Sequence, residues 1–348
     1  MTIVNLMRLT RFAAPVVAAA LAWPPPVAAE TAVHLKLDRK IDGPAAPFFL
    51  AIDRGYFKAE GLDVTVDATA ADPQDTIKLL TTAHYDLAVS ELNLLIELRD
   101  QSATGIKAVF VVFDKPPAAI IARRSRGIAA PGDLAGKTLG APSGEPATAR
   151  WPIFANATGI ESAKVKVENV GRAVRDPMLA SGEVDAVTGS SFTSYIDLKD
   201  RGVPQNDLVV WLMADYGVEL YGDAIMASEN FAAERPDALR AFLRAYVKAL
   251  QDTVRDPAGA IEAVLRRSDG AKKDVELARL RMAIADNIVT PAVRTGGFGA
   301  VDPTRFAAAL DQLALIYSFK AKDKAADSFD PTFLPPAAER SISNTASR

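Results

Sequence analysis

The chain has 348 residues, of which 49% are apolar and 24% charged, so a disordered or fibrous protein is excluded. This length suggests two domains. The 40 Lys+Arg and 43 Asp+Glu give a net charge of −3, which lacks the positive excess of nucleic-acid-binding proteins. The absence of cysteine excludes disulfides, thiolate metal sites and cysteine nucleophiles. A histidine-ligated metal or a Ser-His-Asp triad would have to use His34 or His84.

The first 29 residues have the pattern of a secretory signal peptide. They contain Arg8 and Arg11 but no acidic residue, and an apolar stretch at 12–23 follows. Val27 and Ala29 are small side chains at the −3 and −1 positions of a signal-peptidase site. The alternative is a membrane anchor, but an apolar run of about 12 residues is shorter than the ~20 that span a bilayer. We therefore expect cleavage after Ala29 and a protein exported to the periplasm.

Strands and helices alternate along the first part of the remaining chain. Alternating apolar residues predict strands, and Asp72-Pro73 supplies the N-cap residue and the N1 proline of a helix. This alternation is typical of a parallel sheet covered on both faces by helices. The expected strands are 33–37, 62–66, 86–89, 106–113 and 118–122, and the expected helices are 48–54, 72–83 and 92–98.

The same pattern begins again near residue 137, and a mostly helical segment follows residue 222. Residues 84–90 resemble residues 183–189, since each segment is a short strand entered through an Asp, which is consistent with two similar α/β lobes. The apolar residues of 236–253 repeat at the spacing of an amphipathic helix. The expected strands are 137–140, 165–170, 184–188 and 207–213, and the expected helices are 147–159, 176–182, 194–201, 236–253, 258–267, 275–288 and 304–317.

Polar side chains follow the carboxyl ends of several predicted strands, where open α/β sheets bind their ligands. Each has a structural alternative, because serines also cap helices and aromatic residues also fill cores. The candidate ligand-binding residues at these ends are Asp38, Arg39, Ser90, Glu91, Asn93, Ser143, Gly144, Glu145, Thr188, Ser190 and Phe192. Three aromatic candidates are added to them, Phe48, Trp151 and Tyr216.

Motifs that carry catalysis are missing from the sequence. No GxxxxGK[ST], GxSxG or HExxH pattern occurs, and Gly297-Phe298-Gly299 follows no predicted strand. His34 alternates with the apolar residues of the first strand and is expected to face solvent. We therefore expect no catalytic residue, no cofactor and no metal site.

Four segments resemble, in order, the NMT1/THI5-like family, the SsuA-type solute-binding proteins of ABC importers. They are APFFLAIDRGYFKAEGLDV at 46–64, YDLA at 85–88, DLAGKTLG at 133–140 and GEVDA at 182–186. The resemblance covers residues 33–265 and implies a type II periplasmic-binding-protein fold, with two α/β lobes, a hinge and a central ligand cleft. It also implies a small-molecule solute and a membrane permease of an ABC importer as partners.

The family also contains fungal enzymes that make the thiamin pyrimidine from pyridoxal phosphate and one of their own histidines. That branch has a lysine and, four residues on, a histidine, where this chain has Ser90 and Leu94. Its iron-binding cysteine cluster would fall near 214–226, and the chain has no cysteine. The family's usual tryptophan after the first strand is Arg39 here.

The sequence thus favours a periplasmic solute-binding protein over a hydroxymethylpyrimidine synthase-like enzyme. The solute would be a small organic molecule, such as a thiamin-precursor pyrimidine, a sulfonate or another heteroaromatic or acidic compound, captured by hinge closure. A soluble partner of a sensor receptor is a third interpretation. We expect a monomer with lobe one at 31–118 plus 220–335, lobe two at 119–219 and a mobile tail at 336–348.

Overall fold

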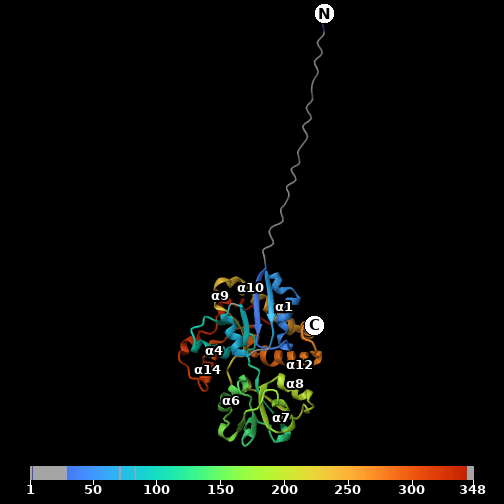
Figure 1. Ribbon diagram of the computed structural model, residues 1–348, viewed down its shortest axis with the longest axis vertical. Helices are drawn as coiled ribbons and strands as arrows, with labels where there is room; N and C mark the ends of the chain where they lie inside the picture. The colour runs from blue at the N-terminus through green and yellow to red at the C-terminus, as the bar shows by residue number, and fades with distance from the viewer. Residues whose placement is uncertain (1, 3–29, 70–71, 83, 343–348) are drawn as a thin grey trace.

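The computed structural model describes residues 30–69, 72–82 and 84–342, together with residue 2. The predicted signal peptide at 1–29 therefore lies outside the described residues. The described chain forms two lobes, one above the other in Figure 1, each built on a five-stranded sheet. None of the described helices is both long enough and apolar enough to cross a bilayer.

The first lobe contains a sheet with the strand order β2-β1-β3-β10-β4. Its strands are β1 (Thr31–Leu37), β2 (Leu62–Asp67), β3 (Leu87–Glu91), β4 (Lys107–Val111) and β10 (Asp223–Ala227). Strand β1 is parallel to β2 and β3, whereas β10 is antiparallel to both of its neighbours.

The second lobe repeats this arrangement with the order β7-β6-β8-β5-β9. Its strands are β5 (Ala118–Arg123), β6 (Thr138–Gly140), β7 (Lys166–Glu168), β8 (Ala186–Ser190) and β9 (Leu208–Leu212). Strand β6 is parallel to β7 and β8, and β5 is antiparallel to β8 and β9. The two lobes and the strand order confirm the fold class expected from the sequence.

The prediction of purely parallel sheets is wrong, because each sheet contains one inserted strand of opposite direction. Strands β10 and β5 are the strands by which the chain enters each lobe from the other one. Each begins at the cleft edge, where Asp223 pairs with Glu91 and Ala118 pairs with Ser190, so each runs against the strands that end there. Strand β10 was also not predicted, since its five residues show no alternation of apolar and polar side chains.

Helices cover both faces of each sheet. The first lobe carries α1 (Ala46–Asp53), α2 (Tyr56–Ala59), α3 (Pro73–Lys78), α4 (Leu92–Gln101), α9 (Glu229–Glu234), α10 (Pro236–Arg255), α11 (Pro257–Leu265), α12 (Lys273–Ala283), α13 (Pro291–Gly296), α14 (Pro303–Leu313) and α15 (Lys322–Ala326). The second carries α5 (Pro146–Ala149), α6 (Trp151–Thr158), α7 (Arg175–Ser181) and α8 (Thr193–Asp200). Asp72 caps α3 as expected, accepting hydrogen bonds from two backbone N–H groups.

Two helices differ from the sequence-based expectation. The helix expected at 147–159 is divided at Arg150, since Pro152 has no N–H to continue the hydrogen-bond ladder. The helix expected at 275–288 ends at Ala283 and continues as a π-helical turn. Within the tail that is expected to be mobile, the Arg340 side chain is buried and donates to the carbonyls of Pro335 and Phe298, while its neighbours at 336–339 are exposed.

The chain crosses between the lobes twice, at 112–117 and 213–222, and the two crossings touch backbone to backbone. The N–H groups of Val112 and Phe113 donate to the Asp223 carbonyl, and Gly222 donates to the Phe113 carbonyl. A Cβ atom on Gly222 would lie 2.8 Å from Cβ of Phe113 and 3.0 Å from Cα of Pro116. Glycine at 222 therefore allows the two crossings to approach this closely.

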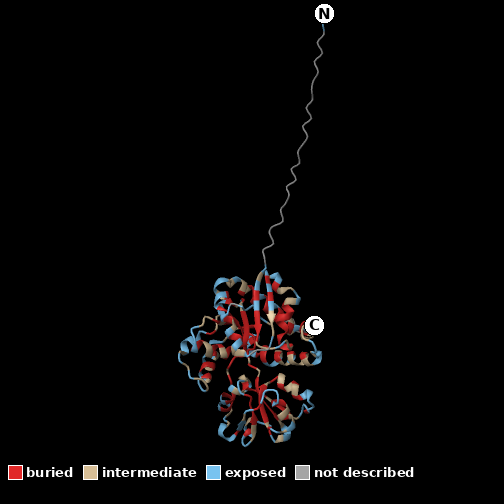
Figure 2. Ribbon diagram, viewed as in Figure 1, coloured by how far each residue is buried: buried red, intermediate tan, exposed pale blue. Residues whose placement is uncertain are grey.

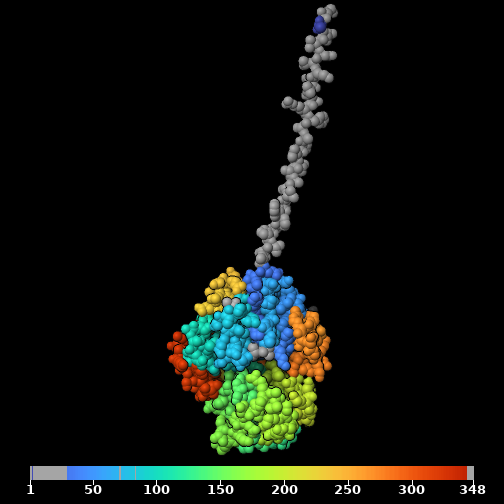
Figure 3. Space-filling model, in the orientation of Figure 1, coloured from blue at the N-terminus to red at the C-terminus, as the bar shows by residue number. Residues whose placement is uncertain are grey.

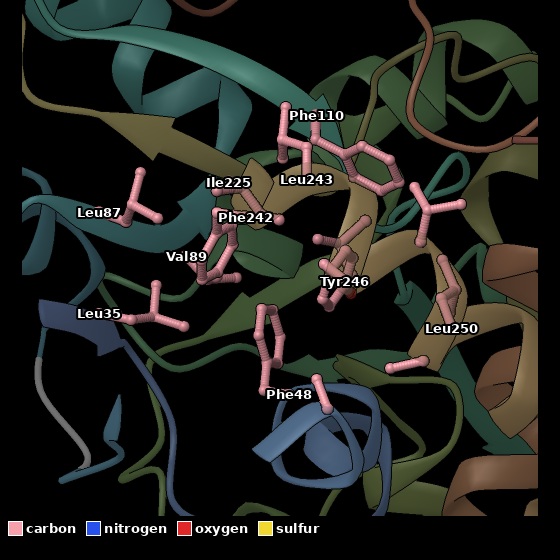
Figure 4. Packing of buried hydrophobic residues seen from close by; sticks show 14 of the residues in the cluster. Leu35, Phe48, Leu87, Val89, Phe110, Ile225, Phe242, Leu243, Tyr246 and Leu250 are labelled. Carbon is pink, nitrogen blue, oxygen red and sulfur yellow. The ribbon is translucent and has the colours of Figure 1, made fainter. Parts of the chain in front are cut away.

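The core of the first lobe lies between its sheet and helices α1 and α10. Phe48 stacks on Tyr246 with ring centroids 4.5 Å apart, and Phe110 meets Tyr246 edge-on at 5.4 Å. Figure 4 shows these side chains converging from α1, β4 and α10. Buried residues follow the strands of both lobes in Figure 2. This packing holds the strand ends of both sheets in fixed positions at the cleft.

The hydroxyl of Tyr246 is fully buried and has no hydrogen-bond partner among the described residues. Burial raises the pKa of this phenol above its usual range. Because an unsatisfied buried polar group is destabilising, Tyr246→Phe should increase the free energy of unfolding by about 1 kcal/mol. Urea unfolding monitored by circular dichroism measures this change.

Tyr221→Phe is the matched control, since the buried Tyr221 hydroxyl accepts a hydrogen bond from the Asp302 N–H at 2.9 Å. That variant should lose about 1 kcal/mol. A loss of stability in Tyr246→Phe as well would show that its hydroxyl is hydrogen-bonded in solution.

Candidate functional site

A cavity of about 500 Å³ lies between the two lobes. Figure 3 shows from outside where the green second lobe meets the first. The cavity wall consists of strand ends and helix starts from both lobes, together with Pro116 and Pro117 of the first crossing. The first lobe contributes Asp38, Arg39, Pro73, Glu91, Gly222 and Asp223, and the second contributes Ala118, Glu145, Pro146, Ala147, Arg172, Ala173, Arg175, Asp176, Pro177, Gly189, Ser190, Thr193, Asp197 and Arg201.

Five of the fourteen residues selected from the sequence line this cavity, and they follow four different strands. These five are Asp38, Arg39, Glu91, Glu145 and Ser190. They follow or end strands β1, β3, β6 and β8, whose carboxyl ends converge at the cleft as the strand-end argument requires.

The four aromatic candidates do not line the cavity. Phe48 is buried against Tyr246, and Phe192 meets the Phe113 ring edge-on at 6.2 Å. Trp151 is 5% exposed and packs against Phe154, which also contacts Tyr216. The helix breaks at Arg150, immediately before Trp151, and the Trp151 ring packs against Phe154 instead of lining the cavity.

The remaining polar candidates support the wall from behind or lie outside it. The buried Ser90 hydroxyl lies 3.0 Å from both the Asp38 carboxylate and the Pro73 carbonyl. The Asn93 amide donates to the Tyr221 carbonyl at 2.8 Å, and the Thr188 hydroxyl bonds to that of Thr148. Ser143 and Gly144 are exposed on the loop after β6.

Several charged residues of the cavity were missed by the sequence analysis. Arg172, Arg175 and Asp176 follow strand β7, whose carboxyl end had not been considered although the strand itself was predicted. Applying the strand-end argument to this strand as well would have identified them. Asp223 begins β10, which was not predicted, and Asp197 lies within α8 rather than at a strand end.

Each of the six carboxylates that line the cavity has an arginine guanidinium within 3.5 Å. In the second lobe, Arg175 contacts Glu145 at 2.7 Å and Asp176 at 2.8 Å, and Arg172 contacts Glu145 at 2.9 Å. In the first lobe, Arg39 pairs with Asp223 and lies 3.5 Å from Asp38. The Arg39 guanidinium also lies over the Phe113 ring, 5.3 Å from its centroid.

Two ion pairs connect the lobes across the cleft. Arg150 of the second lobe lies 2.8 Å from Glu91 of the first, with side chains only 2% and 7% exposed. Arg279 on α12 lies 2.6 Å from Asp197 on α8, with side chains 17% and 38% exposed. The Arg150 and Glu91 atoms at 2.8 Å form an ion pair without hydrogen-bond geometry.

Burial shifts the protonation of the carboxyls on the first-lobe side. Desolvation raises the pKa of Glu91, although the Arg150 charge opposes the shift. Desolvation likewise raises the pKa of Asp38, against the charge of Arg39. In both carboxyls the charge of the neighbouring guanidinium opposes the upward shift of the pKa that burial causes.

The described residues contain no group of three or more His, Asp or Glu side chains placed to hold a metal ion. Neither histidine lines the cavity, and no lysine does so within the part of the chain that the structure describes. What the cavity presents is a set of paired carboxylates and guanidiniums, the Ser190 and Thr193 hydroxyls and a series of prolines. Such a wall can hold a small polar molecule through directed hydrogen bonds.

The fold is that of the periplasmic binding proteins. It is similar to the crystal structure of the periplasmic aliphatic sulphonate binding protein SsuA from Escherichia coli, with a TM-score of 0.69, 16% sequence identity and coverage of 87% of this chain and 94% of that one. The family described as NMT1/THI5 like matches residues 44–260, more than half of the chain. The protein belongs to this family.

Relatives within reach of sequence comparison include both binding proteins and enzymes. The chain is 29% identical over 225 residues to the formylaminopyrimidine-binding protein of Halalkalibacterium halodurans, covering 64% of this chain and 66% of that one. It is 26% identical over 232 residues to the riboflavin-binding protein RibY of Chloroflexus aurantiacus, covering 64% and 62%. It is 25% identical over 221 residues to the 4-amino-5-hydroxymethyl-2-methylpyrimidine phosphate synthase of Schizosaccharomyces pombe, covering 61% and 62%. The matches thus span slightly less than two thirds of each relative.

The burial of Trp151 predicts that substitution of this residue affects the stability of the protein rather than ligand binding. Because its ring is buried beside Phe154, Trp151→Ala should lower the free energy of unfolding by about 3–5 kcal/mol. Trp151→Phe retains a ring at this position and should lose clearly less. Urea titrations of the two variants measure the difference, and equal midpoints for Trp151→Ala and the parent protein would place the residue in the cleft after all.

Asp42, beside Arg279 and Glu276, makes stability depend on pH. Burial raises the pKa of Asp42 to about 6, while Arg39 lowers it and Glu276 raises it further. The folded protein therefore holds this proton more tightly than the unfolded chain. The resulting stabilisation is fully present below pH 4 and is lost as the pH rises through about 6. Relative to the parent protein, Asp42→Asn should gain up to about 3 kcal/mol between pH 4 and 7.

Asp53→Asn provides a control of opposite sign. Burial acts to raise the pKa of Asp53, but hydrogen bonds from Arg267 and Arg266 outweigh it and lower the pKa. Asp53 therefore stabilises the folded protein above its unfolded pKa near 3.8, and this contribution is lost as the pH falls below that value. The deficit of Asp53→Asn relative to the parent should be constant above about pH 5 and should shrink toward lower pH. Thermal melts of both variants between about pH 3 and 7 measure the two dependences, and parallel curves for Asp42→Asn and the parent would contradict the assignment.

Proposed function

We propose that the protein is the periplasmic solute-binding component of an ABC importer. It captures a small organic solute between its lobes and delivers it to a permease in the inner membrane. The observation that carries this proposal is the 500 Å³ cavity walled by both lobes, which are joined by only two chain crossings. A solute that contacts both walls stabilises the closed arrangement, and this differential contact drives hinge closure.

The volume and the wall chemistry define the class of solute. A cavity of about 500 Å³ falls within the usual range of roughly 300–1,000 Å³ for small-molecule sites. Its carboxylates are compensated by guanidiniums, so the wall as a whole favours no strongly charged solute. A heteroaromatic or zwitterionic compound with both donors and acceptors fits this chemistry. Two relatives are named for binding riboflavin and formylaminopyrimidine, which are both heteroaromatic compounds.

The synthase relatives provide the second candidate function. A synthase of the kind implied by the resemblance needs a lysine amine for pyridoxal phosphate, and its position is occupied here by Ser90. Ser90 is fully buried and contacts Asp38 and Pro73, so it offers no amine to the cavity. These contacts support a binding role for the cleft rather than a covalent cofactor.

The function is tested by a thermal-shift screen with pyrimidines, thiamin, riboflavin, sulfonates and aromatic acids. Calorimetry then measures the dissociation constant of the strongest compound for three variants. Glu91→Gln should weaken binding roughly tenfold to 150-fold, because it removes a hydrogen bond made by a charged group. Ser190→Ala tests the opposite wall, where loss of a neutral hydrogen bond should weaken binding about tenfold.

Glu229→Gln is the matched control, since Glu229 begins α9 and does not line this cavity. Melting curves separate loss of binding from loss of folding in each variant. Pyridoxal phosphate and iron are added in a parallel incubation. An aldimine absorbance band or a pyrimidine product there, with no stabilising compound in the screen, would replace the binding role with the enzymatic one.

A further inference from the structure

The ion pair between Arg150 and Glu91 joins the lobes through two side chains that are only 2% and 7% exposed. Arg150 occupies the break between α5 and α6 of the second lobe, and Glu91 ends β3 of the first. Asn93, the second residue of α4, donates to Glu91 at 3.4 Å and to the carbonyl of Tyr221 at 2.8 Å. Asn93 therefore links the pair to the second crossing.

This pair is incompletely satisfied in the structure. Nε and Nη2 of Arg150 and Oε2 of Glu91 have no hydrogen-bond partner among the described residues, although the two charges lie 2.8 Å apart. Only Nη1 of Arg150 donates within its own lobe, to the Pro146 carbonyl at 3.3 Å. Each charge is thus compensated mainly by the other, and both gain water when the lobes separate.

Removing one partner has a different consequence from removing both. A single neutral substitution leaves the opposite charge buried and uncompensated in the closed arrangement, while the open arrangement hydrates it. The single variants should therefore favour opening. Replacing both residues by apolar side chains removes the uncompensated charge and allows closure again. An ordinary surface ion pair does not show this pattern.

The second interlobe pair, Arg279 with Asp197, provides an internal comparison. Its side chains are more exposed, and Arg279 is also paired with Glu276 on its own helix. Water and salt screen such a pair, so its contribution is small. The two pairs lie on different elements, β3 with the α5–α6 break in one case and α12 with α8 in the other.

We propose that Arg150 and Glu91 act as an interlobe lock that sets the open–closed equilibrium of the cleft independently of solute. This inference rests on the proposed hinge-closing function, but it concerns the protein without solute. When the lobes close, the two opposite charges are buried together, each beside the other. Arg150 is then a positioning residue, which acts on the cavity through Glu91 rather than by lining it.

The test uses the absence of cysteine in the chain. Ala59→Cys in the first lobe and Ala163→Cys in the second, both exposed, carry spin labels in an otherwise unlabelled protein. The protein is unfolded in urea, dialysed and refolded to remove any co-purified solute. Pulsed electron–electron double resonance then gives the distance distribution without added solute. The labelled parent should show mainly the shorter distance.

Arg150→Gln and Glu91→Gln should each shift the ratio of long to short distances by about tenfold to 100-fold toward opening. The double variant Arg150→Met with Glu91→Leu should return the ratio close to that of the parent. Arg279→Gln should change it by no more than about fivefold. Circular dichroism confirms folding, and the Glu91 variant keeps the test decisive if the Arg150 variant does not fold.

An unchanged distribution in both single variants would overturn the lock, as would a double variant as open as the single ones. A labelled parent that is mainly open would overturn it too. None of these outcomes depends on the identity of the solute. If no compound in the screen binds but the variants shift the distance distribution as expected, the proposed solute classes are rejected and the interlobe lock is retained.

Discussion

The charged wall of the cavity depends on the arginine guanidinium that lies beside each of its carboxylates. An isolated carboxylate in this position would take up a proton or keep the cleft hydrated, since desolvation opposes its charge. The raised pKa values of Glu91 and Asp38 show this cost directly. Pairing allows the strand ends of both sheets to carry charged groups into the cleft between the lobes. The core packing fixes the positions of the strands, and the charge pairing makes a polar wall at their ends possible.

Paired charges also influence how such a site discriminates among solutes. A solute group that approaches a carboxylate already held by an arginine must improve on that contact, or accept a hydrogen bond from an atom the arginine leaves free. Selectivity then comes from the geometry of the remaining donors and acceptors rather than from net charge. Prolines at 73, 116, 117, 146 and 177 narrow the choice further, because they present rigid apolar surface without an N–H group.

The sequence was sufficient to predict the fold, since the alternation of strands and helices and four family segments each indicate two α/β lobes. Asp38, Glu91 and Ser190 were placed at the cavity because strand ends converge for topological reasons. Trp151 was misplaced, because helix phase says nothing about which side of a broken helix meets the core. The pairing of Arg150 with Glu91 could not be predicted, since it joins distant residues across two lobes and depends on how the lobes pack. Strand β10 was missed because five residues are too few to establish a period.

The contact between the two crossings at Gly222 has a mechanical consequence for the hinge. Phe113, Gly222 and Asp223 exchange backbone hydrogen bonds, so the crossings form a short two-stranded ribbon rather than two separate tethers. A ribbon bends readily out of its plane, whereas bending within the plane stretches the hydrogen bonds on one side. Bending of the two crossings is thereby easiest out of the plane of this ribbon. A side chain at position 222 would push the two strands of the ribbon apart and remove this directional preference.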